Sequence, residues 1–347
     1  MRWMYVVMAT AVASVVCAPA SGQTATPSAS GSVGGLTAKF VDVKGVKARY
    51  YEAGQGEPMV LIHGGSTGGS STANVWSRNI PALSKKFHVF AVDRLGSGLS
   101  GNPADPKDYD TPGQVEFIYQ FIQALKLNHI HLVGHSAGGA VALYTAINHP
   151  EMFKTLVIVA EGPENPSAGN GPTRLEPALK KCPDQNVYEG LKCRVEALAW
   201  LPTTFDDEYW KADVYMATLP KSKEARAAVA ARAGDPQRAK DSAAYREQMW
   251  DRVRRDGVLQ MPVLIYSGKN DVLDWSVADP TAMLRGELGL FDILATKNTR
   301  VQMNIINQGG HFMYREHPDE FNRDLIAFID YWNAHPAPTG APTTPSR

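Results

Sequence analysis

The sequence predicts an α/β protein with a doubly wound, mostly parallel sheet and a mainly helical cap insertion, and two patterns predict this class. Short runs of nearly continuous apolar residues recur along the chain, as in parallel strands that are covered on both faces. The segments between them carry apolar residues at helical spacing, and repeated strand and helix units place helices on both faces of one sheet. The expected parallel strands are 59–62, 87–92, 130–133, 156–160, 263–266 and 301–306.

The other elements follow in chain order. Residues 39–41 and 47–51 are β-rich runs on either side of Gly45, and they predict an opening antiparallel hairpin. Apolar residues at positions 115, 118, 122 and 125 predict a helix between two of the later strands. A terminal helix is indicated by the same spacing in Phe321, Leu325, Phe328, Ile329 and Trp332.

The alternation of strands and helices stops between 162 and 261. This stretch contains charged helical runs and many aromatic and methionine side chains, so we expect a helical cap over the carboxyl edge of the sheet. Such side chains are candidates to line an apolar pocket, and packing between cap helices explains any one of them equally well. The α/β core then comprises 37–161 and 262–335.

The beginning of the chain differs in character from the rest. A positive residue precedes an apolar run, and small residues end at Ala20, which is typical of a secretory signal peptide (1–20) cleaved after Ala20. The apolar run is too short for a membrane span. Lipidation at Cys17 is the less favoured alternative, because the preceding valine replaces the small residue expected there. We expect a periplasmic or secreted protein with a flexible leader (21–36) and a disordered tail (336–347).

Export leaves two cysteines, Cys182 and Cys193, which we expect to form a disulfide worth about 2–3 kcal/mol. Two unpaired buried thiols are the alternative, and two cysteines without nearby histidines do not predict a metal site. The chain has 35 basic and 35 acidic residues, so its net charge gives no attraction to nucleic acid or to an anionic membrane. The expected partner is a small-molecule substrate.

Ser136 is the candidate nucleophile. It stands in the sequence Gly-His-Ser-Ala-Gly, after an apolar run and before a helical pattern, and this strand, turn and helix lifts a serine oxygen clear of a sheet. The pattern Gly-x-Ser-x-Gly occurs again around Ser66. Ser66 runs into glycine, serine and threonine residues that do not start a helix easily, so Ser136 is preferred.

A serine hydroxyl needs a general base, and the base needs an orienting carboxylate. His311 is the best candidate base, because it follows the last expected strand and so lies over the same sheet edge as the serine. Asp271, after the preceding strand, is the preferred acid because it keeps the chain order serine, acid, histidine. Asp274 and Glu161 are the alternative acids.

An oxyanion that forms at this site requires two backbone donors. The N–H of Ala137, directly after the nucleophile, is one candidate. The other lies in the glycine-rich loop after the strand 59–62, with Gly65 the preferred donor.

These motifs together resemble the α/β-hydrolase superfamily over about 36–334: a His-Gly-Gly loop, the sequence DRLGSGLS (93–100), the serine turn, a Gly-x-x-Asp loop and a late Gly-His. Within it, the glycine loop and the sequence up to Ile80 are similar to the meta-cleavage product hydrolases, which cut carbon–carbon bonds in vinylogous diketones. The resemblance implies that Asn74 contacts substrate, and a loop-capping role is the alternative.

The sequence also departs from that group of hydrolases. His135 stands in the serine turn where those enzymes usually have asparagine, and Phe312 follows the histidine where they usually have tryptophan. Both are candidate substrate-binding positions. A secretory signal is also unexpected for intracellular ring-fission catabolism.

The leading expectation is an exported serine hydrolase that cleaves a carboxylic ester of a small or medium apolar compound, without metal or organic cofactor. A carbon–carbon hydrolase acting on a diketone or ring-fission dienoate is the first alternative. A ligand-binding protein on a hydrolase scaffold is the second.

Overall fold

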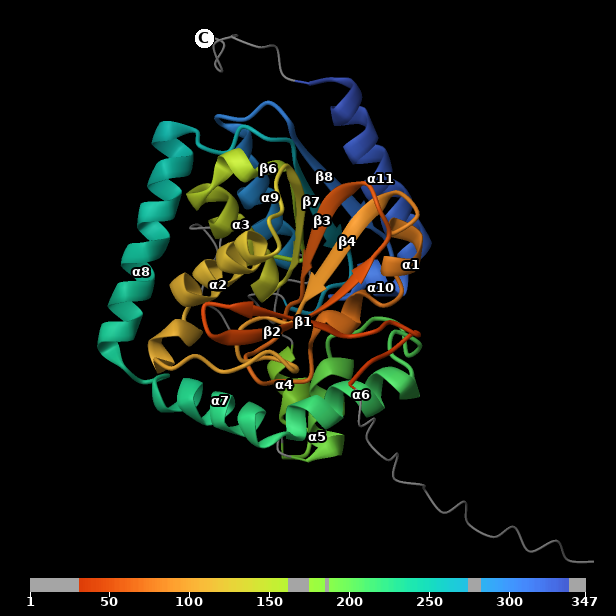
Figure 1. Ribbon diagram of the computed structural model, residues 1–347, viewed down its shortest axis with the longest axis vertical. Coiled ribbons are helices and arrows are strands. Elements are labelled where there is room, and N and C mark those ends of the chain that lie inside the picture. Colours follow the sequence, from red (N-terminus) through yellow and green to blue (C-terminus); the bar gives the residue numbers. More distant parts are fainter. Residues whose placement is uncertain (1–30, 162–174, 185–186, 274–281, 337–347) are drawn as a thin grey trace, which may run out of the picture.

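The computed structural model describes residues 31–161, 175–184, 187–273 and 282–336, so the expected signal peptide lies outside the described residues. One sheet of eight strands has the order β1-β2-β4-β3-β5-β6-β7-β8 (Figure 1). β1 and β2 form the expected antiparallel hairpin, β2 pairs antiparallel with β4, and the remaining neighbours are parallel. The predicted fold class is confirmed.

The strands agree with the apolar runs to within a few residues. They are β1 (Lys39–Val43), β2 (Val46–Ala53), β3 (Glu57–Ile62), β4 (Phe87–Val92), β5 (Ile130–His135), β6 (Phe153–Val159), β7 (Val263–Gly268) and β8 (Val301–Ile306). The helices are α1 (Ile80–Leu83), α2 (Thr111–Ala124), α3 (Ala137–Asn148), α4 (Leu175–Leu179), α5 (Tyr188–Glu196), α6 (Asp207–Thr218), α7 (Pro220–Ala231), α8 (Pro236–Asp251), α9 (Ala282–Ala295), α10 (Met313–Glu316) and α11 (Pro318–Ala334).

Alternate residues of the central strands face two separate apolar clusters. In β3, Val60 and Ile62 join the cluster that includes α2 and α3, whereas Met59 and Leu61 join the one that includes α11. All four side chains are fully buried. Both faces of the sheet are therefore covered, which is why these strands are apolar at consecutive positions.

The helices of the segment 162–261 fall into two groups that contact different parts of the protein. Helices α5, α6 and α7 lie across one end of the sheet, and α8 runs alongside the layer that contains α2 and α3 (Figure 1). Met249 and Trp250 at the end of α8 belong to the core cluster of that layer. The last part of the segment 162–261, which was expected to belong to the cap, therefore packs against the α/β core.

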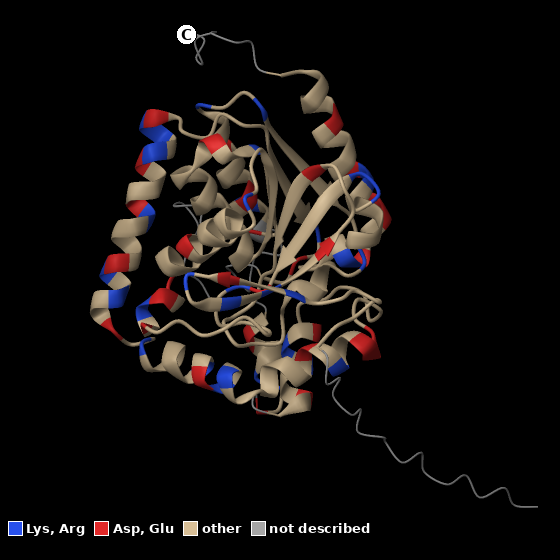
Figure 2. Ribbon diagram, viewed as in Figure 1, with Lys and Arg blue, Asp and Glu red and all other residues tan. Residues whose placement is uncertain are grey.

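The predicted disulfide is present: Cys182 and Cys193 are bonded, with their Cα atoms 5.6 Å apart. It joins the turn after α4 to α5, inside the cap. Acidic and basic residues alternate along the helices (Figure 2). Within the described ranges, none of the helices combines the length and apolar character needed to cross a membrane.

Candidate active site

Ser136 occupies a sharp turn between β5 and α3. Its backbone has φ 52° and ψ −128°, a strained conformation for a non-glycine residue. A Cβ on Gly134 would lie 2.3 Å from the carbonyl oxygen of Gly138, and one on Gly138 would lie 2.3 Å from that of His63. Strand, helix and glycine loop approach this closely only with glycine at both positions. Ser66, in contrast, lies in a loop, and the next helical turn begins only at Ala73.

His311 and Asp271 come together at the ends of β8 and β7. The Nδ1 atom of His311 donates to Oδ2 of Asp271 at 2.8 Å, and both side chains are buried. A Cβ on Gly268 would lie 2.4 Å from the carbonyl oxygen of Gly310, so the two loops pack backbone to backbone. Since Nδ1 carries the proton, Nε2 of His311 is left as the acceptor that a general base requires.

The other two acids occupy different positions. Asp274 lies outside the described residues. Glu161 follows β6 and is buried beside Gly139 of α3. The carboxylate that contacts the His311 ring is thus that of Asp271.

The serine turn and the histidine loop are in contact through His135. The ring centroids of His135 and His311 are 4.7 Å apart, and Nε2 of His135 donates to the carbonyl oxygen of His311 at 2.8 Å. Within the described residues, no hydrogen bond joins the Ser136 hydroxyl to His311. Catalytic hydrogen bonds are often long before substrate binds and shorten in the complex.

Two backbone donors flank the serine. A Cβ on Gly64 would lie 2.8 Å from Cβ of Ser136, so the loop after β3 is in contact with the nucleophile. In the described part of the chain, neither the N–H of Gly65 nor that of Ala137 has an acceptor. Two free donors beside a serine are what a developing oxyanion requires.

The polar groups of His135 are used inside the protein. Its Nε2 bonds the His311 carbonyl, and its Nδ1 accepts from the Tyr314 hydroxyl at 3.2 Å. Burial, and then the neighbouring His311, hold the pKa of His135 well below its usual range, so the ring stays neutral. These contacts place His135 in support of His311, and its substrate-binding role stays a prediction. Phe312 is also buried and packs against Phe205 at 4.9 Å, joining core and cap.

Asn74 belongs to a buried network. Its oxygen accepts from Arg49 and from the Tyr51 hydroxyl, and its amide nitrogen donates to the carbonyl of Gly31 and to Asp213 of α6. The side chain is fully buried and its hydrogen-bonding groups are occupied. Thr72, and not Asn74, caps the short helix that Asn74 enters, and the expected substrate contact of Asn74 stays a prediction.

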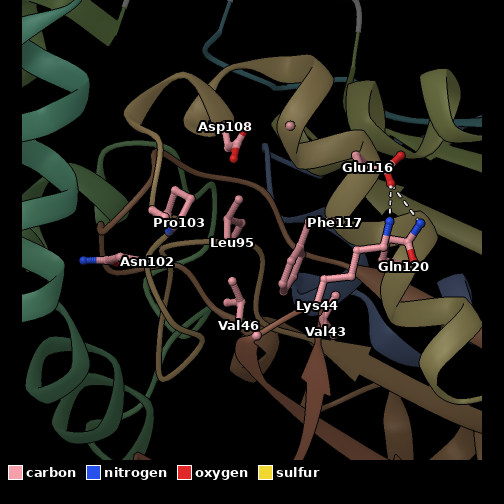
Figure 3. Close-up of a pocket in the computed structure, with 13 residues that line it drawn as sticks. Val43, Lys44, Val46, Leu95, Asn102, Pro103, Asp108, Glu116, Phe117 and Gln120 are labelled. Atoms are coloured by element: carbon pink, nitrogen blue, oxygen red, sulfur yellow. Dashed lines mark hydrogen bonds and ion pairs between the residues drawn. The ribbon is translucent and has the colours of Figure 1, made fainter.

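A cavity of about 440 Å³ lies elsewhere, between the β1–β2 turn and α2 (Figure 3). Val43, Val46, Leu95 and Phe117 contribute apolar surface, and Lys44 pairs with Glu116 at its rim. None of the candidate site residues lines it. Among the described residues, no three His, Cys, Asp or Glu side chains are grouped so that they could hold a metal ion.

Comparison with known proteins identifies the family. The sequence profile of the α/β-hydrolase fold matches residues 57–318. A 2-hydroxy-6-oxo-6-(2'-aminophenyl)hexa-2,4-dienoic acid hydrolase from Metapseudomonas resinovorans is 37% identical over 122 residues, which are 35% of this chain. That match spans only 41% of the relative's own length.

Two further proteins match over most of their length. A 2-hydroxy-6-oxononadienedioate/2-hydroxy-6-oxononatrienedioate hydrolase from Paraburkholderia xenovorans (strain LB400) is 26% identical over 300 residues, 84% of this chain and 95% of that relative. The solved 2-hydroxy-6-oxo-6-phenylhexa-2,4-dienoate hydrolase from Rhodococcus sp. strain RHA1 has a TM-score of 0.67 at 20% identity and covers 85% of this chain and 99% of its own. At that identity the structural likeness shows the fold alone. Because the family profile matches most of the chain and the sheet and serine turn agree with it, this chain belongs to the α/β-hydrolase fold family.

Proposed function

We propose that this protein is a serine hydrolase that forms an acyl-enzyme on Ser136 and cleaves a carbon–carbon bond in a ring-fission dienoate. The observation that carries the proposal is a strained serine beside two N–H groups that have no acceptor among the described residues, at the sheet edge where His311 and Asp271 are bonded. The relatives named above are hydrolases of dienoic acids, and this supports the choice of bond over the ester expected from the sequence.

The proposed chemistry uses only groups of this chain and water. The Ser136 oxygen bonds to the ketone carbon while its proton passes to Nε2 of His311, and Asp271 holds the resulting imidazolium. The N–H groups of Ala137 and Gly65 bind the negative oxygen. The substrate reacts as its keto tautomer, in which the proton of the 2-hydroxyl has moved to the carbon next to the attacked ketone. Collapse of the tetrahedral intermediate then breaks the bond between these two carbons, and its electron pair enters the conjugated keto group as a dienolate that takes the proton from the His311 imidazolium. Water then releases the acid from the serine.

Ester hydrolysis is the second candidate, and one observation favours it. His135 and Phe312 occupy the positions where the resembling dienoate hydrolases usually have asparagine and tryptophan, and both are buried against each other. An ester also places smaller demands on the site, because its alkoxide leaving group needs only the proton held by His311.

Turnover of 2-hydroxy-6-oxo-6-phenylhexa-2,4-dienoate, compared with p-nitrophenyl butyrate, separates the candidates. We expect stoichiometric benzoate from the dienoate, abolished in Ser136→Ala and unchanged in the control Ser66→Ala. Ester turnover without dienoate consumption would make the esterase the function. Labelling of Ser136 by a fluorophosphonate, followed by intact mass, tests its activation. An unlabelled serine in a protein that binds dienoate would instead indicate a ligand-binding protein.

We further propose export, with cleavage after Ala20. The disulfide between Cys182 and Cys193 supports an oxidising compartment. Fractionation of the native cells and sequencing of the mature amino terminus test this proposal. A mature protein that begins at residue 21 in the periplasm or medium is expected, and an uncleaved chain in the cytosol would overturn it.

A further inference from the structure

Arg94, the second residue after β4, is a buried cation that donates to backbone carbonyl groups. The residue is 4% exposed, and within the described part of the chain no carboxylate pairs with it. Its Nη2 donates to the carbonyl oxygens of Gly64, at 3.3 Å, and of Gly65. Burial lowers the pKa of Arg94 to about 10, so the guanidinium is still charged at neutral pH. A lone buried charge is costly, and among the described residues its hydrogen-bond acceptors are the carbonyl groups of the glycine loop.

The backbone of the same residue acts on the same peptide through His63. The N–H of Arg94 donates to Nε2 of His63 at 2.9 Å, so the ring proton is on Nδ1, which donates to the carbonyl oxygen of Gly64 at 2.7 Å. Burial, and then the charge of Arg94, lower the pKa of His63 to about 3, so the ring is neutral and its tautomer is fixed. The Gly64 carbonyl thus receives two donors that both depend on residue 94.

The Gly64 carbonyl belongs to the same peptide group as the Gly65 N–H, which is the proposed oxyanion donor. The Gly64 C=O and the Gly65 N–H belong to one trans peptide and point in opposite directions. Donors on the carbonyl therefore fix where the N–H points and strengthen it as a donor. Gly65 has φ +79°, a region that glycine enters freely, so the local backbone alone does not fix this peptide.

We propose that Arg94 is a positioning residue of the oxyanion hole: with His63, it orients and polarises the Gly64–Gly65 peptide so that the Gly65 N–H faces the negative oxygen formed on attack by Ser136. The inference rests on the proposed function only in requiring that attack. An oxyanion on the opposite side of the peptide lies on the order of 8 Å from the guanidinium. At an effective dielectric constant of about 20, the attraction between the positive guanidinium and the negative oxygen corresponds to about 30-fold faster acylation.

Arg94→Met, which removes the charge and the donors, tests the proposal against Arg226→Met. Arg226 is a cation of α7 that donates to the carbonyl of Gly68 in the same loop, outside the oxyanion peptide. We expect Arg94→Met to slow single-turnover acylation by p-nitrophenyl acetate by about 30-fold with KM within about 3-fold. Phenylboronic acid, whose adduct with serine mimics the tetrahedral oxyanion, should lose affinity by a similar factor. Arg226→Met should keep both values.

The remaining outcomes are also decisive. Arg94→Lys, which keeps the charge and loses the fork, should recover part of the rate, and it serves as the variant if Arg94→Met does not fold. Acylation at the wild-type rate, or equal slowing in the Arg94 and Arg226 variants, would overturn the proposal. If the wild type is acylated neither by the ester nor by a fluorophosphonate, the proposed function fails, and a crystal structure of the Arg94 variant decides. A rotated Gly64–Gly65 peptide would still support the positioning role, and an unchanged one would refute it.

Discussion

Replacing Asp213 with asparagine should remove a pH dependence of stability that arises between cap and core. Asp213 lies on α6 and is fully buried. Its carboxylate accepts from the hydroxyl of Thr72 at 3.0 Å and from the amide of Asn74 at 2.6 Å. Burial raises the pKa of Asp213 from 3.8 to about 7, against the effect of these donors, and the charge of Asp93 adds to the rise.

The sign of the effect follows from the raised pKa. The folded protein holds this proton more tightly than the unfolded chain, so the stabilisation is fully present below about pH 4 and is lost as the pH rises through about 7. With these two pKa values, the free energy of unfolding falls by about 2.5 kcal/mol between pH 5 and pH 8 through Asp213. Asparagine has the same shape and no proton to lose, so the variant lacks this decrease.

Urea unfolding followed by circular dichroism, at several pH values from 5 to 8, measures the effect. The informative quantity is the free energy of unfolding of the wild type minus that of Asp213→Asn, because buried histidines contribute equally to both proteins. It should fall by about 2.5 kcal/mol over this range. Asp241→Asn, on the exposed side of α8, is the control. The free energy of unfolding of the wild type minus that of this variant should not change with pH. A flat difference for Asp213→Asn as well would show that the carboxyl is already ionised at pH 5 and would refute the reasoning.

Three further predictions concern the site and the cap. Asp271→Asn should lower kcat by about 10³- to 10⁴-fold, because the amide favours the wrong tautomer of His311, and steady-state kinetics with unchanged circular dichroism would show it. The double variant Cys182→Ser/Cys193→Ser should lose about 2–3 kcal/mol in urea unfolding, and no change in the unfolding midpoint would contradict a bonded pair in the purified protein. Gly268→Ala should displace the loop after β7, since its methyl group would meet a carbonyl oxygen at 2.4 Å. Activity should fall together with thermal stability, and a fully active, stable variant would contradict the close backbone packing.

The elements that the sequence could predict are those whose signals are local. The apolar run, sharp turn and helix around Ser136 are contiguous, and so is the loop that carries Asp271 after its strand. The disulfide could be predicted from the short separation of the two cysteines together with the expected export. In each case the information lies within about a dozen residues, which is the range over which backbone preference and periodicity act.

The features that the sequence did not predict depend on contacts between distant segments. Asn74 was interpreted from its motif, but its amide bonds Asp213, 139 positions further along the chain. Two signals for Arg94 were present in its motif: an arginine two residues after a strand, and no acidic residue other than Asp93 beside it. Neither indicates that the guanidinium meets the glycine loop, because that contact arises only when β3 and β4 pair side by side.

Contacts between distant segments also join the cap to the loops after β3 and β4. Helix α7 donates from Lys221 to the carbonyls of Gly96 and Gly98 and from Arg226 to that of Gly68, while α6 holds the loop after β3 through Asp213. Burial lowers the pKa of Lys221 to about 8, and the amine has only carbonyl oxygens as hydrogen-bond acceptors in the described structure. A displacement of α6 and α7 would separate these partly buried charges from their carbonyl acceptors, and it would leave the buried Asp213 carboxyl without its donors Thr72 and Asn74. These contacts therefore tie α6 and α7 to the loops after β3 and β4.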